Sequence, residues 1–191
     1  VGLIGTTNST NLPVLNAGGG AYYQGTNAGS NDFFLVKFNL NTGVREHATY
    51  YGGSGIDGGT SHGNGADCDA SGNLYFAGMS QSTNLNLVNP GGGAYFDNTQ
   101  NGSDDLVLAK FGPTGNLIWS TLIGGSGDDM NYSMDLHVDR TNSRLYLGTC
   151  TGSTNIPTMT LAGAFNDNTN NGGTDAYIAR FTLNGVMQWG T

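Results

Sequence analysis

The sequence predicts an all-β protein whose strands form β-propeller blades, and three observations support this prediction. First, one unit recurs: equivalent strands end on Phe38, Phe111 and Phe181, which are 73 and 70 residues apart. Second, segments such as 74–79 and 145–150 alternate between two faces, the period of a β-sheet. Third, no window shows a sustained apolar stripe at helical spacing, and the 33 glycines would interrupt most helices.

Taken in order, the expected strands follow this two-residue period and are separated by turn sequences or long loops. They cover residues 1–6, 32–39, 44–51, 64–69, 73–80, 105–111, 116–123, 131–139, 144–151, 175–182 and 185–190. Segment 106–111 is apolar on both faces apart from Lys110, which indicates a strand covered above and below. Gly, Pro and Asn at 70–73, 112–115 and 184–185 predict tight hairpin turns.

About four short strands in each period of about 70 residues fit a propeller blade plus one long loop. The GGSG segments at 52–55 and 124–127 are expected to lead the chain back to the innermost strand of the next blade, because glycine allows unusual backbone angles. On this register blade 1 spans 1–56 and lacks its innermost strand, blade 2 spans 57–127 and blade 3 spans 128–191. Closed propellers use about four to eight blades. We therefore expect the rest of a larger propeller chain, or protein partners, to complete the ring.

Several recurring segments are similar to those of one known family. They are DAYIARF at 175–181, WSTLIGGSGDD at 119–129, GNLYFAG at 72–78, STNIP at 153–157 and GAF at 163–165. In combination they resemble the bacterial β-propeller repeat family abbreviated SBBP over nearly the whole chain. The resemblance implies a large secreted or surface-displayed bacterial protein and does not imply a reaction. Residues 58–62 lengthen one crossing loop, and Cys68 stands where the family has valine.

Composition and charge exclude some classes of partner. The formal net charge is −8, and six Lys and Arg residues cannot form the basic stripe that binds nucleic acid or an anionic membrane surface. No segment reaches the roughly 18 apolar residues that would span a bilayer, so we expect no membrane insertion. An acidic, weakly charged surface favours an extracellular or cell-surface location. The chain has neither an initiating Met nor a signal peptide, so we expect it to be processed or excised.

Acidic residues at the crossing loops form the candidate metal site. Asp57, Asp128 and Asp129 follow the glycine-rich loops, and their carboxylates could bind calcium together with loop carbonyls. The competing interpretation is a crossing loop without a metal; calcium is the only cofactor that we consider. Asp135, His137 and Asp139 lie on one face of a strand and form a second candidate metal-binding group. Alternate residues of a strand are about 7 Å apart, too far for all three to share one ion, so we favour a structural role.

The long loops form the candidate ligand-binding surface. In each loop a small-residue run leads to an aromatic residue, Tyr22, Tyr95 or Phe165, which we expect to plug the loop onto its blade. Beyond the plugs stand the candidate glycan-binding residues, and exposed aromatics beside amides are typical of such surfaces. These residues are Tyr23, Phe96, Asn166 and Asn168.

We therefore expect a non-catalytic, extracellular structural or adhesive β-propeller module of a bacterial surface protein or assembly. The alternative is a carbohydrate-binding propeller with one loop site per blade. A hydrolase that uses loop carboxylates is the third hypothesis, and no residue is assigned a catalytic role, because the sequence has no Ser elbow and its histidines occupy non-equivalent positions.

Overall fold

The computed structural model describes residues 1–59, 63–129 and 134–191. Its ordered elements are β-strands, and no helix is present in these ranges. The strands are β1 (Gly2–Thr7), β2 (Asp32–Phe38), β3 (Arg45–Tyr51), β4 (Gly65–Cys68), β5 (Leu74–Ser80), β6 (Asp105–Phe111), β7 (Leu117–Ile123), β8 (Asp135–Asp139), β9 (Arg144–Thr151), β10 (Asp175–Thr182) and β11 (Met187–Gly190). The all-β class is confirmed.

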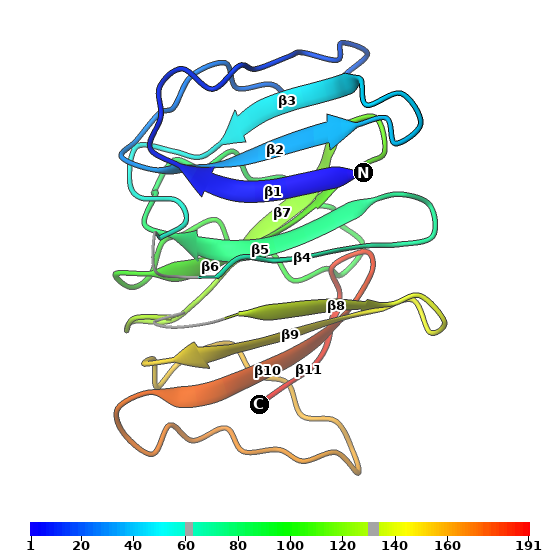
Figure 1. Cartoon of the computed structure of the whole chain (residues 1–191). Helices are drawn as coiled ribbons and strands as arrows, with labels where there is room; N and C mark the ends of the chain where they lie inside the picture. The colour runs from blue at the N-terminus through cyan, green and yellow to red at the C-terminus, as the bar shows by residue number, and fades with distance from the viewer. Residues whose placement is uncertain (60–62, 130–133) are drawn as a thin grey trace.

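The strands form three antiparallel sheets, here called sheet 1, sheet 2 and sheet 3 in chain order. Sheet 1 has the order β1-β2-β3, sheet 2 the order β4-β5-β6-β7, and sheet 3 the order β8-β9-β10-β11. The sheets stack in a row, with sheet 2 between the other two and β4 beside β8 (Figure 1). The row does not close into a ring, so the structure establishes three stacked antiparallel sheets, and a propeller remains a proposal.

Most predicted strand positions agree with the structure to within one or two residues. The predicted strand at 64–69 is shortened to β4, because the Asp69 carboxylate accepts hydrogen bonds from the amides of Ser71 and Asn73 and closes the turn. Part of the predicted strand at 131–139 lies outside the described residues, and its described part is β8.

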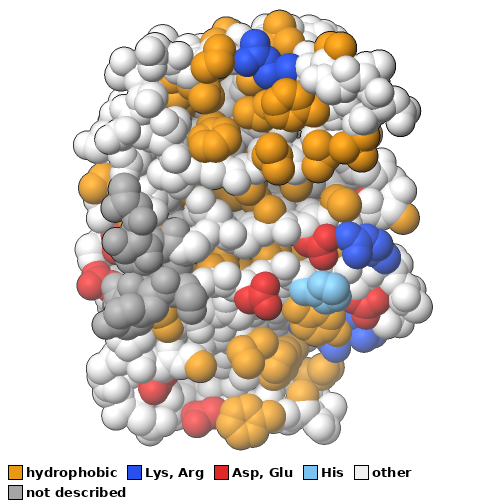
Figure 2. All heavy atoms as spheres, in the orientation of Figure 1, with side chains coloured by type: hydrophobic (Ala, Val, Ile, Leu, Met, Phe, Trp, Pro, Cys, Tyr) orange, Lys and Arg blue, Asp and Glu red, His pale blue; other side chains and the backbone are white. Residues whose placement is uncertain are grey.

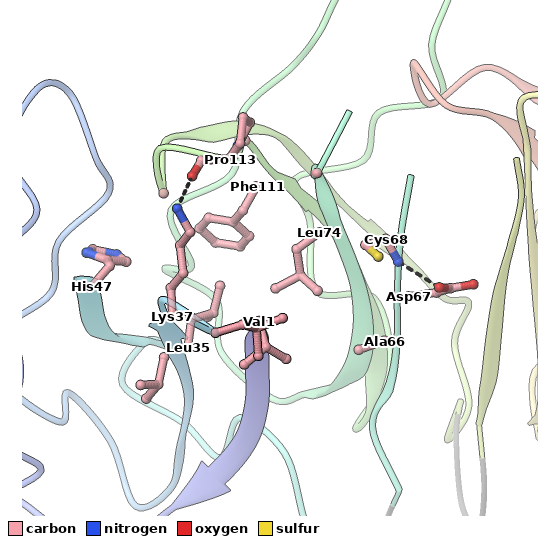
Figure 3. A pocket seen from close by; sticks show the side chains of 16 residues that line it. Val1, Leu35, Lys37, His47, Ala66, Asp67, Cys68, Leu74, Phe111 and Pro113 are labelled. Atoms are coloured by element: carbon pink, nitrogen blue, oxygen red, sulfur yellow. Dashed lines mark hydrogen bonds between the residues drawn. The ribbon is translucent and has the colours of Figure 1, made fainter. Parts of the chain in front are cut away.

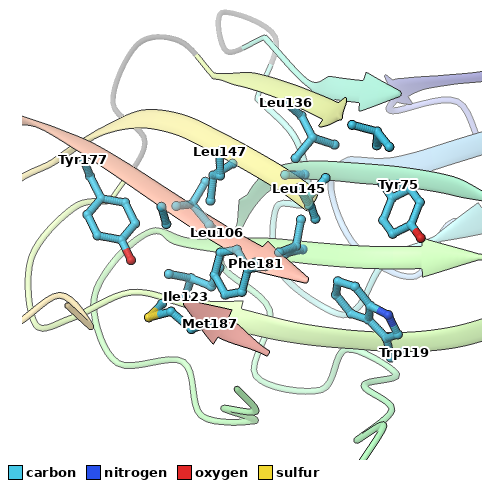
Figure 4. Close-up of a cluster of buried hydrophobic side chains, with 14 of the residues drawn as sticks. Tyr75, Leu106, Trp119, Ile123, Leu136, Leu145, Leu147, Tyr177, Phe181 and Met187 are labelled. Carbon is cyan, nitrogen blue, oxygen red and sulfur yellow. The ribbon is translucent and has the colours of Figure 1, made fainter. Parts of the chain in front are cut away.

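The hydrophobic core consists of two layers between the sheets. Phe33 and Tyr51 of sheet 1 pack on Phe76 and Phe111 of sheet 2, with ring centroids 5.2 to 5.7 Å apart across the two sheets. Figure 4 shows the second layer, in which side chains of sheet 2 meet those of sheet 3. Its labelled members are Tyr75, Leu106, Trp119, Ile123, Leu136, Leu145, Leu147, Tyr177, Phe181 and Met187. Sheet 2 is therefore buried on both faces, as the apolar segment 106–111 predicts.

The surface carries few charges. In Figure 2 apolar side chains are spread over both the upper and the lower part of this face, and acidic, basic and histidine side chains stand together at mid-height on the right. Leu3 and Leu40 of sheet 1 are 52% and 78% exposed. No helix that could cross a membrane occurs in the described part of the chain.

Candidate functional site

Asp57, a predicted calcium ligand, is fully buried where the first glycine-rich loop enters sheet 2. Its carboxylate accepts hydrogen bonds from the Gly53 amide at 2.6 Å, the Ser80 hydroxyl at 2.5 Å and the Ser82 hydroxyl at 2.7 Å. The donors come from the loop and from the end of β5, so the carboxylate fastens one to the other. Asn84 adds a further contact, because its Oδ1 accepts from the amide and hydroxyl of Ser54.

Asp129 repeats this arrangement one sheet further on. It accepts from the Gly125 amide at 2.7 Å and from the hydroxyls of Thr151 and Ser153 at 2.5 and 2.8 Å. We call these two arrangements the crossing-loop clamps. The neighbouring Asp128 has an exposed side chain and belongs to neither clamp.

The clamp donors bear on the calcium hypothesis. An N–H or O–H group directed at a carboxylate occupies the lone pairs that a cation would need, whereas a calcium site surrounds the ion with oxygen acceptors. No group of three or more His, Cys, Asp or Glu side chains converges in metal-binding geometry within 1–59, 63–129 and 134–191. Calcium binding stays a prediction. In the structure, each clamp carboxylate joins its loop to a strand through hydrogen bonds.

A second buried carboxylate lies beside each clamp. Asp32 accepts from the Gln24 side chain at 2.7 Å and the Ala28 amide at 2.9 Å, and Asp105 accepts from the Asn101 amide at 2.9 Å. Burial raises the pKa of Asp32 and Asp57, and it raises the pKa of Asp105 to about 6, with the charge on Asp129 adding to the effect. Each crossing loop thus encloses a pair of buried carboxyl groups, Asp32 with Asp57 and Asp105 with Asp129.

The predicted ligand-binding residues lie on the long loops of three different sheets and are not brought together into one site. Tyr23 is 42% exposed and Phe96 is half-buried. Asn166 holds its own loop, because its side chain donates to the carbonyls of Leu161 and Ala164 and accepts from the Leu161 amide. Asn168 lines a small hollow of about 40 Å³.

The loop plugs behave differently in sheet 3. The Tyr22 ring packs edge-on against Tyr51 and Phe111, and Tyr95 packs against the second core layer, as expected. Phe165 is 74% exposed, so the prediction that it is a plug is wrong in this structure. The physical reason is that the first two plugs pack on the following sheet, and Phe165 has no following sheet to cover it.

A hollow of about 610 Å³ lies between sheets 1 and 2 beside β1 (Figure 3). Val1, Leu35, Leu74, Phe111 and Pro113 give it an apolar lining. Lys37, His47, Asp67 and Cys68 supply its polar groups. The Lys37 ammonium donates to the Pro113 carbonyl at 2.8 Å and pairs with Glu46 at 3.0 Å.

Burial lowers the pKa of His47, so its ring is held neutral at the wall of the hollow. Sequence reasoning missed this hollow because its lining comes from six strands of two sheets and follows no local motif. A hollow with an apolar lining and few polar groups can receive an apolar side chain or a further strand. Cys68 and Cys150 are both free thiols.

The acidic group on β8 has a structural role. Asp139 caps its turn by accepting from the amides of Thr141 and Asn142, as expected. His137 Nδ1 lies 3.4 Å from the Asp67 carboxylate of β4, which also accepts from the Val138 amide at 2.9 Å. These contacts tie the first strand of sheet 2 to the first strand of sheet 3.

No protein-family description matches this chain, and no curated protein matches it. The resemblance to the SBBP repeat family therefore remains a prediction made from the sequence.

Proposed function

We propose that the chain is a non-catalytic structural or adhesive module of β-propeller type, acting outside a bacterial cell as part of a larger assembly. The observation that carries this proposal is the crossing-loop clamp, which occurs twice with the same donors in the same places. In each clamp a buried carboxylate joins the loop that leaves one sheet to a strand of the next sheet.

The location rests on the surface. The net charge is −8, with 10% of residues charged, and the exposed loops are rich in Asn, Thr and Gly. Antibodies against the chain are expected to label intact cells that produce it, with the signal removed by external protease. Labelling that requires permeabilised cells would refute the extracellular part of the proposal.

A glycan-binding propeller is the second candidate, because Tyr23 is 42% exposed on a loop beside amide side chains. A glycan array tests it with the parent chain, the double variant Tyr23→Ala/Phe96→Ala, and Val44→Ala as a control elsewhere on the surface. For a structural module we expect no glycan signal that depends on Tyr23 and Phe96. A signal lost in the double variant and kept in the control would establish the second candidate instead.

Calcium dependence is tested by thermal melting in chelator and in excess calcium. The donor-filled clamps lead us to expect the same melting temperature in both. A calcium-dependent rise that Asp128→Asn removes would place an ion at the second crossing loop.

A further inference from the structure

The contacts between adjacent sheets follow a rule that includes a basic side chain. Lys37 of sheet 1 donates to the carbonyl of Pro113, in the β6–β7 turn of sheet 2, at 2.8 Å. Lys110 of sheet 2 donates to the carbonyl of Leu183, in the β10–β11 turn of sheet 3, at 3.2 Å. Each lysine stands one residue before the repeated phenylalanine of its own sheet. Each acceptor stands two residues after the repeated phenylalanine of the following sheet. Tyr75, paired with Lys110 in the sheet, donates to the same Leu183 carbonyl at 3.4 Å.

A second contact joins each long loop to the same turn. The Tyr22 amide donates to the Gly115 carbonyl, and the Tyr95 amide donates to the Gly185 carbonyl, both at 2.9 Å. These two turn glycines have φ of +86° and +82°. In both described interfaces between sheets, therefore, the turn of one sheet accepts hydrogen bonds from a basic side chain and a loop amide of the preceding sheet. The loop aromatic packs beside this turn.

Sheet 3 presents the receiving groups again on its outer face. Arg180 occupies the position of Lys37 and Lys110, and it pairs with Tyr146 as Lys110 pairs with Tyr75. Arg180 Nε is buried and has no hydrogen-bond partner within the described ranges. Phe165 occupies the plug position and is 74% exposed. One difference is that the Trp189 indole donates to the Phe165 carbonyl at 3.0 Å, whereas the equivalent Trp119 donates to the turn of the next sheet.

Sheet 1 presents the matching turn on the opposite end of the row. Leu40 stands two residues after the repeated Phe38, as Pro113 and Leu183 do after theirs, and it is 78% exposed. Gly43 has φ of +70°, like the turn glycines of the other sheets. A Cβ placed on Gly43 would have no atom within 4 Å, while one on Gly115 would lie 3.0 Å from the His47 ring of the preceding sheet. The turn of sheet 1 is open, and it is one residue longer than the other two, since Gly43 stands five residues after Phe38 whereas Gly115 and Gly185 stand four after theirs.

We propose that the outer face of sheet 3 binds the β2–β3 turn of a second copy of this chain, head to tail. Arg180 and Tyr146 donate to the Leu40 carbonyl of that copy, the Phe165 amide donates to its Gly43 carbonyl, and the Phe165 ring packs on its Phe38. This inference rests on the proposed function, since it supplies the assembly in which the module acts. It assigns new roles to residues that the stacking of the described sheets leaves unused.

A second copy is the occupant that the observations favour, because this chain carries both halves of the interface. The interface would continue the geometry that already joins sheet 1 to sheet 2 and sheet 2 to sheet 3. It is heterologous, so it either closes into a ring or propagates. Two copies supply six sheets, within the range of about four to eight in closed propellers.

Light scattering on the size-excluded chain over a wide concentration range tests the proposal. We expect the mass to rise with concentration from 19.8 kDa to twice that value or to longer head-to-tail multiples. Arg180→Ala and Phe165→Asp should each weaken association about tenfold or more, because a charged hydrogen bond or a buried ring is lost. Arg180→Lys is the matched control and should associate like the parent, since sheets 1 and 2 use lysine at this position.

A mixing experiment identifies the two complementary faces. Phe165→Asp removes one face, and Leu40→Arg weakens the other by placing a second cation against Arg180. Each variant alone should therefore associate weakly, whereas an equal mixture should form pairs through the one intact interface. Circular dichroism and melting of each variant at low concentration establish that the monomer is folded. A mass of 19.8 kDa at every concentration, or association that neither variant weakens, overturns the proposal. Neither result bears on the cell-labelling or glycan experiments that test the proposed function.

Discussion

Asp128 and Asp129 are adjacent in the sequence and have opposite environments. Asp129 is fully buried and accepts three hydrogen bonds from the loop and from β9, whereas the Asp128 side chain is exposed. A buried carboxylate with three donors is costly to remove, because the donors then lose their partner inside the protein. The same substitution therefore has different consequences at these two positions.

We predict that Asp129→Ala lowers the free energy of unfolding by about 3 kcal/mol, since three buried donors are left unsatisfied. Asp128→Ala should change it by less than about 0.5 kcal/mol, because its side chain faces solvent. Denaturant unfolding measures both. Equal effects of the two substitutions would contradict the role given to the clamp.

The pH dependence of stability follows from Asp105. Burial raises the pKa of Asp105 in the folded protein to about 6, above its value in the unfolded chain, so the folded state binds more protons between about pH 4 and pH 6. This group therefore stabilises the protein as the pH falls through that window, by roughly 3 kcal/mol in total. The expected observation is that the parent gains stability relative to Asp105→Asn between pH 7 and pH 4. Parallel pH profiles of the two proteins would show that Asp105 is ionised normally.

The crossing loops depend on close approaches between backbone segments. Gly102, in the long loop of sheet 2, lies so near the carbonyls of Gly125 and Gly127 that a Cβ would overlap them. Gly148, within β9, has no atom within 4 Å of a Cβ position. Packing therefore requires glycine at position 102 and does not require it at position 148.

Replacing Gly102 with Ala is expected to lower the free energy of unfolding by about 2 kcal/mol or more, because the loop backbone must move away from the crossing loop. Gly148→Ala serves as the control and should be neutral or stabilising, since alanine reduces the entropy of the unfolded chain without a clash. Thermal melting compares the two variants. Tolerance of alanine at Gly102 would show that the loop is not held where we place it.

At the scale of the whole molecule, the core lies between the sheets and not within any one of them. Both hydrophobic layers draw side chains from two adjacent sheets, and sheet 2 contributes to both. A sheet taken alone would expose its share of each layer to water. The three sheets should therefore unfold together.

Leu147→Ala tests this coupling. Leu147 is fully buried against sheet 2, so we expect a loss of about 2 to 5 kcal/mol, with the same midpoint by tryptophan fluorescence and by circular dichroism. Ile178→Ala, on the outer face of sheet 3 where the side chain is 45% exposed, should cost much less when measured at low protein concentration. Separate transitions for the two signals would mean that sheet 3 unfolds on its own.

The sequence by itself determined the strands, the turns, the repeat and the burial of both faces of residues 106–111. These features follow from a two-residue period and from turn residues such as Gly115, which act over a few neighbours. The sequence does not show that Asn84 and Asn155 hold the serine of each glycine-rich loop.

Only the tertiary structure decided which of Asp128 and Asp129 is buried, where the 610 Å³ hollow lies, and that Phe165 is left uncovered. Each of these depends on contacts between residues far apart in the chain, such as Asp129 with Ser153 or Lys37 with Pro113. Local sequence patterns contain no information on how one sheet is placed on the next, because that placement is fixed by the packing of side chains from both sheets at once.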